Sequence, residues 1–261
     1  MNVKTELSQD LSFALQICKE AGKLALAHFK QGVEVTMKPD NTPVTLADKE
    51  CESLIRKLIS ERYPDDAILG EEEEAREGSA ESKRKWIIDP IDGTYNFARG
   101  IPIFSLLLAL ELNGEIVIGV VHNPANDDTF YAEKGQGAFR NGLHVHVSKV
   151  EKLEDSQFVF GAPNRILSFG YWNGFTKLIE ATYRQRGLGD YLNFAYVFEG
   201  KAEAALEVGL KPWDIAPMKI IVEEAGGRFS DLDGGNSVYT GSCLVSNGKV
   251  HDAYFKMLMT P

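Results

Sequence analysis

The apolar positions of the first 60 residues recur mostly at helical spacing. Between residues 8 and 30 they fall on one face, which predicts a long amphipathic helix with Ser8 as its N-cap. Residues 33–37 predict a short strand, and the two prolines within residues 38–45 predict a loop after it. A second amphipathic helix is then expected to start at residue 45 or 46.

Strand-like patterns dominate the next part of the chain. Apolar runs predict three strands, over residues 86–89, 104–111 and 115–122. The pair Asn113-Gly114 has the sequence of a tight hairpin turn, and a further hairpin is expected at Asn141-Gly142. Residues 70–85 are charged and poor in apolar side chains, which predicts a mobile solvated loop.

The second half of the chain alternates between strand and helix patterns. Strands are expected near 158–161, before Gly189, and over 202–208, 228–230 and 243–246, and helices over 171–184, 190–199, 214–225 and after His251. No repeat or flexible linker divides the chain, so we expect a single domain, 1–261. Residues 1–150 would carry a larger antiparallel sheet and residues 151–261 a second α/β half. The predicted fold class is α/β (α+β), with sheets layered between helices.

The composition predicts a globular protein that neither binds nucleic acid nor spans a membrane. Of the 261 residues, 44% are hydrophobic and 25% charged, and the formal net charge of −10 opposes nonspecific binding to nucleic acid. The longest apolar run, residues 101–110, is too short to cross a bilayer, and the N-terminus lacks a signal-peptide pattern. The three scattered cysteines predict reduced, buried thiols and a cytoplasmic location.

One stretch, residues 86–97, combines the features of a cation site. Its apolar strand ends in Asp89 and Asp92, which are followed at once by Gly93 and Thr94. The proline after Asp89 favours an extended backbone there, and Gly93 allows backbone N–H groups to approach a ligand closely. Two carboxylates and free amides in one turn suit a metal ion bridged to an oxyanion such as phosphate.

Three further acidic residues admit both a structural role and a role in metal binding. Asp48 fits a capping box with Thr45, and Asp214 fits the cap of its own helix. Glu71 is the first of four consecutive glutamates, which are usually solvated. Each residue taken alone leaves both interpretations open.

These acidic residues lie in four ordered motifs. The motifs are Lys38-Pro-Asp-x4-Thr45-x-x-Asp48, Gly70-Glu71-Glu72, Trp86-Ile-Ile-Asp89-Pro-Ile-Asp92-Gly93-Thr94 and Trp213-Asp214-x-Ala-x8-Ala225-Gly226-Gly227. In this order and at this spacing, they resemble the inositol monophosphatase family of magnesium-dependent, lithium-sensitive phosphatases. The resemblance implies a layered α/β/α/β/α sandwich of the inositol monophosphatase and fructose-1,6-bisphosphatase type, and a homodimer.

The same resemblance implies a set of magnesium ligands. Glu71, Asp89 and the Ile91 carbonyl would bind one ion, and Asp89, Asp92 and Asp214 a second, with two or three ions in the site. Magnesium prefers such hard oxygen ligands, and a pair of ions can clamp the attacking and leaving oxygens of an in-line displacement. Without cations, the clustered carboxylates would repel one another.

Catalytic roles are implied for residues next to these ligands. The nucleophile would be a water on the first metal, held with the help of Glu71, and its proton would leave through Thr94, which Asp48 would orient. Asp92 and the backbone amides of Gly93 and Thr94 would bind the phosphoryl oxygens.

The substrate must be inferred from the second half, because the family hydrolyses inositol phosphates, histidinol phosphate, sugar bisphosphates and nucleotide 3′-phosphates. The Gly-Asp190-Tyr sequence resembles the histidinol-phosphate phosphatases of the family. Asp190 and Glu207 would pair with the cationic groups of histidinol phosphate, and Asn164 and Arg165 would line the same pocket. A helix cap is the alternative role for Asp190, and inositol 1-phosphate is the alternative substrate.

The sequence therefore predicts a phosphatase that hydrolyses L-histidinol phosphate to L-histidinol and phosphate, a step of histidine biosynthesis. The alternative of a different class is a dimeric regulatory or binding protein that has kept the fold without catalysis. Because every ligand position of the four motifs is occupied, we favour the enzyme.

Overall fold

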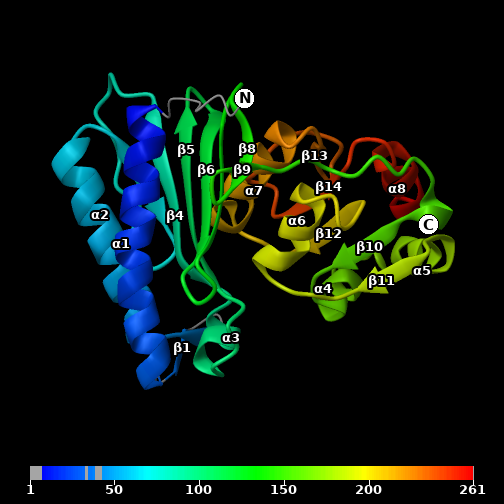
Figure 1. The fold of residues 1–261 in the computed structure, drawn as a ribbon, viewed down its shortest axis with the longest axis horizontal. Coiled ribbons are helices and arrows are strands. Elements are labelled where there is room, and N and C mark those ends of the chain that lie inside the picture. Colours follow the sequence, from blue (N-terminus) through cyan, green and yellow to red (C-terminus); the bar gives the residue numbers. More distant parts are fainter. Residues whose placement is uncertain (1–7, 33–34, 39–42, 261) are drawn as a thin grey trace.

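Two β-sheets alternate with three layers of helices across residues 8–32, 35–38 and 43–260, the parts that the computed structural model describes (Figure 1). The outer layers are α1 (Gln9–Gln31) with α2 (Leu46–Arg62), and α4 (Pro163–Ser168) with α5 (Trp172–Ala181) and α8 (His251–Leu258). Between the sheets lie α6 (Tyr191–Phe198) and α7 (Pro212–Glu224). The expected α/β/α/β/α sandwich is confirmed.

The larger sheet has seven strands in the order β3-β4-β5-β6-β7-β8-β9, and the smaller has five in the order β11-β10-β12-β14-β13. The larger sheet is mixed, because its edge strand β3 runs parallel to β4. Its strands are β3 (Ala67–Gly70), β4 (Arg84–Asp92), β5 (Ser105–Leu112), β6 (Glu115–Asn123), β7 (Asp128–Glu133), β8 (Gly137–Arg140) and β9 (Leu143–His144). Those of the smaller sheet are β10 (Gln157–Phe160), β11 (Arg184–Arg186), β12 (Ala204–Val208), β13 (Arg228–Asp231) and β14 (Ser242–Ser246).

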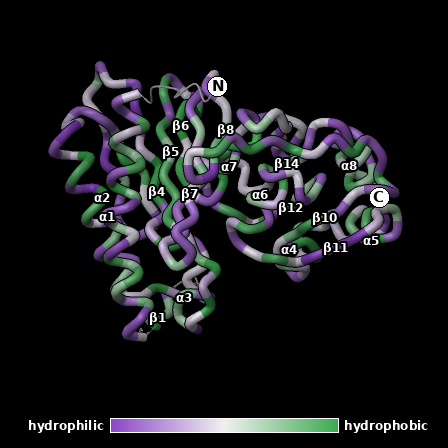
Figure 2. Tube along the Cα trace, in the orientation of Figure 1, coloured by the Kyte–Doolittle hydropathy of each residue, from purple (hydrophilic) through white to green (hydrophobic). Residues whose placement is uncertain are grey.

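Alternate residues of the central strands enter different cores. In β4, Ile87 packs with α6 and α7, whereas Ile88 packs with α1 and α2. Leu107 and Leu108 of β5 divide in the same way. A sheet that is covered on both faces needs apolar side chains at odd and at even positions of each strand. This explains the continuous apolar runs along β4, β5 and β6 (Figure 2).

Both predicted Asn-Gly turns are confirmed. Asn113 and Gly114 join β5 to β6 with φ values of 53° and 81°, and Asn141 and Gly142 join β8 to β9 with 48° and 83°. Positive φ at both central positions is the type I′ geometry, which matches the twist of the flanking strands.

Several element boundaries differ from the prediction. The helix expected over 171–184 ends at Ala181, because Arg184 already belongs to β11. Within the segment predicted as a loop, β2 (Pro43–Val44) pairs with β1 (Thr36–Met37), and residues 33 and 34 of the expected strand lie outside the described parts. Neither α4 nor the short helix α3 (Thr94–Ala98) was predicted, because each is too short to show a helical period. β7 was also not predicted, although shorter strands were.

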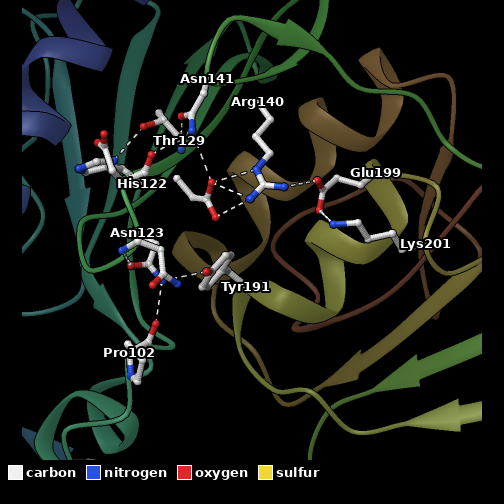
Figure 3. Close-up of polar contacts among 12 residues, drawn as sticks. Pro102, His122, Asn123, Thr129, Arg140, Asn141, Tyr191, Glu199 and Lys201 are labelled. Atoms are coloured by element: carbon white, nitrogen blue, oxygen red, sulfur yellow. Dashed lines mark hydrogen bonds and ion pairs between the residues drawn. The ribbon is translucent and has the colours of Figure 1, made fainter.

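Polar contacts fasten both ends of α6 to the larger sheet (Figure 3). The Arg140 guanidinium in β8 pairs with Asp128 of β7 at 2.7 Å and with Glu199, the residue that follows α6. At the other end, the Asn123 side-chain amide donates to the Tyr191 hydroxyl at 2.8 Å. The start of α6 is therefore fixed relative to the end of β6.

The composition-based predictions concern cysteines and membranes. Cys18, Cys51 and Cys243 are free and buried, as predicted. Each helix of the described residues falls short of the length or the apolar character that crossing a membrane requires.

A glycine allows α7 to lie directly against the larger sheet. A Cβ atom at Gly119 of β6 would lie 2.5 Å from the Ile220 side chain and 2.7 Å from the Pro217 carbonyl oxygen. Both neighbours belong to α7, whose first turn also carries Asp214. The packing at Gly119 therefore helps to fix the position of Asp214.

We expect Gly119→Ala to lower the free energy of unfolding by about 1–3 kcal/mol, because the backbone of α7 must move away. The measurement is the midpoint of urea denaturation. Gly187→Ala is the control, since a Cβ there would meet nothing closer than 3.5 Å and its effect should stay within about 0.5 kcal/mol. Equal midpoints for wild type and Gly119→Ala would contradict the packing argument.

Candidate active site

A cavity of about 760 Å³ opens where the end of β4 meets the starts of α3, α6 and α7. Ten of the predicted site residues line it: Glu71, Asp89, Ile91, Asp92, Gly93, Thr94, Arg165, Asp190, Glu207 and Asp214. Asp48 is buried behind Thr94, and Asn164 is exposed and does not line the cavity. The structure thus brings together residues from both halves of the chain.

One wall of the cavity is formed by the carboxylates of Glu71, Asp89, Asp92 and Asp214 (the acidic wall), and the three aspartates form its centre. One carboxylate oxygen of each lies within 4.8 Å of the others. Residues three apart in a regular strand point to opposite faces, but β4 contains one extra residue here, since Asp89 pairs with Leu107 and Asp92 with Ser105. This β-bulge directs both carboxylates into the same cavity.

Asp214 combines its two predicted roles. It lies in the first turn of α7, and its Oδ2 atom accepts a hydrogen bond from the Lys211 amide at 2.7 Å. A carboxylate at a helix N-terminus is also stabilised by the helix dipole. The structural role therefore orients Asp214 and does not exclude it from the metal site.

Glu71 reaches the same site from the neighbouring strand. Because β3 is parallel to β4 and Gly70 pairs with Ile88, Glu71 follows beside Asp89. The Lys38 ammonium lies 2.8 Å from its Oε1 atom. Burial nevertheless raises the pKa of Glu71 to about 7, against the lowering effect of Lys38 and with added repulsion from Glu72 and Asp214.

The electrostatics of the acidic wall favour the binding of a positive charge. The pKa of Asp89 is well above its usual range because of burial, and then because of Glu71, Asp214 and Asp92. The pKa of Asp92 is also raised, by burial first and then by Asp190 and Asp214. Closely packed, buried carboxylates fit a hard divalent cation such as Mg²⁺, which prefers oxygen ligands and would remove their repulsion.

Thr94 connects the acidic wall to Asp48. Its hydroxyl oxygen lies 3.1 Å from Asp48 Oδ1 and 3.0 Å from the Ile91 carbonyl oxygen. The other carboxylate oxygen of Asp48 accepts hydrogen bonds from the amide and hydroxyl of Thr45. Asp48 is thus both the N3 member of the capping box of α2, whose N-cap is Thr45, and the partner of Thr94, and burial raises its pKa.

Asp190 and Glu207 occupy the part of the cavity that the second half supplies. Burial raises the pKa of Asp190 to about 6 and that of Glu207 to about 8. The Asn193 side chain donates to Glu207. Although Asp190 precedes α6, its side chain makes no capping hydrogen bond, so the alternative that it merely caps this helix is wrong.

Sequence reasoning missed Glu52 and Arg56, which hold the turn formed by the four glutamates 71–74 (the glutamate turn). Glu52 of α2 is fully buried and accepts hydrogen bonds from the Glu72 amide at 2.7 Å and the Glu73 amide at 3.1 Å. The Arg56 guanidinium donates to Glu52 at 2.7 Å. The Glu72 side chain is only 4% exposed, so it is an exception to the predicted solvated loop, in which residues 73–75 are exposed. An ion pair at i,i+4 on the apolar side of α2 was the available signal.

Comparisons with known proteins support the resemblance seen in the four motifs. The model of the inositol monophosphatase family matches residues 6–258. A Chlorobaculum parvum protein named histidinol-phosphatase is 40% identical over 92% of each chain, and a Thermotoga maritima protein named fructose-1,6-bisphosphatase/inositol-1-monophosphatase is 38% identical over 95% of each. Among solved structures, the extragenic suppressor protein suhB from Bartonella henselae has a TM-score of 0.90 at 32% identity, over 97% of this chain and 99% of that one.

The family match spans residues 6–258, and the fold agrees with that of the solved suhB structure over 97% of the chain. The acidic cavity lies where the matching motifs meet. The chain therefore belongs to the inositol monophosphatase family and is a phosphoric monoester hydrolase.

Proposed function

We propose that the protein is a magnesium-dependent phosphatase that hydrolyses L-histidinol phosphate to L-histidinol and phosphate. The observation that carries the choice of substrate is the pair of carboxylates, half-buried Asp190 and buried Glu207, in the cavity outside the proposed metal-ligand set. The identity of 40% to a protein named histidinol-phosphatase supports the same choice.

The residues proposed to hold magnesium are Glu71, Asp89, the Ile91 carbonyl, Asp92 and Asp214, with two or three ions in the site. This donor set consists of oxygens, as Mg²⁺ requires, and its members have raised pKa values that cations would reverse. When bound, the ions would supply Lewis-acid stabilisation of the phosphoryl group and an activated water.

The remaining catalytic groups act on protons and on the phosphoryl oxygens. The Thr94 hydroxyl is proposed to accept the proton of the attacking water while its own proton passes to Asp48, whose raised pKa makes it a better acceptor. The amides of Gly93 and Thr94 are proposed to donate to the phosphoryl oxygens. Gly93 has a φ of 84°, a conformation that glycine adopts readily at the turn from β4 into α3.

The charges around the cavity favour a cationic alcohol. Six acidic residues line it and only three basic ones, Lys38, Arg165 and Lys211. Lys38 is already paired with Glu71 and Glu72. An ammonium group near Asp190 would lower the pKa of this carboxylate and so gain binding energy that a neutral inositol cannot provide.

Inositol 1-phosphate remains the competing substrate, because the Thermotoga maritima relative carries an inositol-1-monophosphatase name. The homodimer, lithium sensitivity and cytoplasmic location stay predictions from the sequence.

Parallel turnover of four esters tests the proposed substrate: histidinol phosphate, inositol 1-phosphate, fructose 1,6-bisphosphate and 3′-phosphoadenosine 5′-phosphate. We expect kcat/KM for histidinol phosphate to exceed the others by about tenfold or more, the value of one buried charge pair. A higher value for inositol 1-phosphate would refute the substrate, and no phosphate release from any ester with Mg²⁺ would favour the noncatalytic role.

Asp92→Asn or Asp214→Asn should lower kcat by about 10³-fold or more, because a metal ligand and its charge are lost. Circular dichroism should show a native fold, since removing one of several repelling carboxylates does not destabilise the metal-free protein. Asp252→Asn is the control, because Asp252 is an exposed carboxylate in α8. Full activity in either ligand variant would refute the proposed site.

Magnesium should raise the thermal midpoint more at pH 8 than at pH 5. Without metal, Glu71 and Glu207 hold their protons up to about pH 7 and 8, well above the usual carboxyl value of 4.5. The folded state therefore binds more protons than the unfolded state in this range, so the unfolding free energy falls as pH rises from about 4.5 to 8. Mg²⁺ binds deprotonated Glu71, a proposed metal ligand, and offsets its part of this loss.

The measurement is differential scanning fluorimetry with Mg²⁺ and with EDTA at each pH. Asp92→Asn should reduce the magnesium-dependent shift at pH 8. An equal shift in wild type at both pH values would show that the ions do not bind these carboxylates.

A further inference from the structure

The backbone at Asp190 has a conformation that L-residues rarely adopt. Its φ is 49° and its ψ −147°, close to the first central position of a type II′ turn, which glycine favours. The preceding Gly189 has a φ of 85°, but Asp190 itself carries a side chain. Such a conformation persists only where the surroundings enforce it, and it is common at functional sites.

Two contacts from residues 89–96, the turn proposed to bind metal (the metal-binding turn), hold Asp190 in this conformation. The Asn96 side-chain amide donates to Asp190 Oδ2 across 94 residues of sequence. The next backbone amide, that of Tyr191, donates to Asp92 Oδ2 at 3.0 Å. The Tyr191 hydroxyl is itself held by Asn123 (Figure 3). The side chain and the following peptide are thus both fixed by the first half of the chain.

The turn is shaped to receive this carboxylate. A Cβ atom at Gly93 would lie 3.2 Å from Asp190 Oδ2 and 3.0 Å from the Ile103 carbonyl oxygen. The second N–H of the Asn96 amide donates to that same Ile103 oxygen, at 3.1 Å. Because both N–H groups have an acceptor, the orientation of the Asn96 amide is fixed.

Asn96 holds Asp190 without carrying a charge, and this indicates its role. A lysine or arginine at this position would hold Asp190 but would also neutralise it. An amide donates a hydrogen bond and leaves the negative charge available to a ligand. The arrangement suits a carboxylate that is positioned by the protein and reserved for a cation in the cavity.

We propose that Asn96 is a positioning residue that fixes Asp190 for recognition of the substrate ammonium, and so determines specificity from within the metal-binding turn. This inference rests on the proposed function, because it assigns the ammonium of histidinol phosphate to Asp190. It predicts that Asn96 acts on substrate choice and not on the chemical step.

The test is a double-mutant cycle with two substrates. Asn96→Ala, Asp190→Asn and the double variant are assayed with histidinol phosphate and with its analogue that lacks the amino group. We expect Asn96→Ala to raise KM for histidinol phosphate about tenfold, while kcat and the constants for the analogue change by less than about twofold. In the Asp190→Asn background, the same substitution should leave the preference for the amine unchanged.

Two further variants separate positioning from packing. Asn96→Leu keeps a branched, uncharged side chain but removes both N–H donors, so it should reduce the preference for the amine at least as much as Asn96→Ala. Asn247→Ala is the matched control, because the Asn247 amide is buried and donates to the Val150 carbonyl at 2.8 Å, outside the cavity. It should lower the thermal midpoint without changing the preference.

An equal loss of amine preference with and without the Asp190 carboxylate would overturn the proposal. The same cycle is measured by thermal denaturation without substrate, where additive shifts would also overturn it, because the hydrogen bond predicts coupling. If the wild-type enzyme hydrolyses the analogue as efficiently as histidinol phosphate, the proposed substrate is refuted. The positioning of Asp190 by Asn96 is still tested, because the thermal cycle does not depend on the substrate.

Discussion

The mutual repulsion of buried carboxylates is the constraint on which this structure depends. The bulge in β4, the parallel edge strand β3 and the first turn of α7 each direct an acidic side chain into one cavity. Burial and proximity then raise the pKa values of Glu71, Asp89 and Asp92 together. A fold that accepts this energetic cost has a use for cations at that point.

The site exists only because the two sheets are held in register. The core between the sheets buries α7, and Gly119 lets that helix approach β6 closely. Arg140 and Asn123 fasten the two ends of α6, which begins at the substrate side of the cavity. Packing far from the cavity therefore fixes the distance between the acidic turn at the end of β4 and the residues at the start of α6.

The sequence alone predicted those parts of the site that depend on residues close together in the chain. Asp89, Asp92 and Thr94 lie in one turn, and the two members of the capping box, Thr45 and Asp48, are three positions apart. Asp214 could be placed beside them only through the family motif, because no local pattern reports a contact over more than a hundred residues. Asn96 was missed for the same reason, since its partner Asp190 lies on another element. Glu52 also binds another element, but its i,i+4 pair with Arg56 was a local signal. The five layers followed from the resemblance of the motifs to the family, whereas α3 and α4 were too short to show a helical period.

The contact between Glu52 and the glutamate turn bears on the entropy of ligand binding. Glu52 binds the amides of Glu72 and Glu73, and Gly70 leaves room for it, since a Cβ there would lie 2.1 Å from its carboxylate. The turn after β3 is therefore ordered when the chain folds. A ligand that engages Glu71 does not have to immobilise this backbone, and more of its interaction energy remains as affinity.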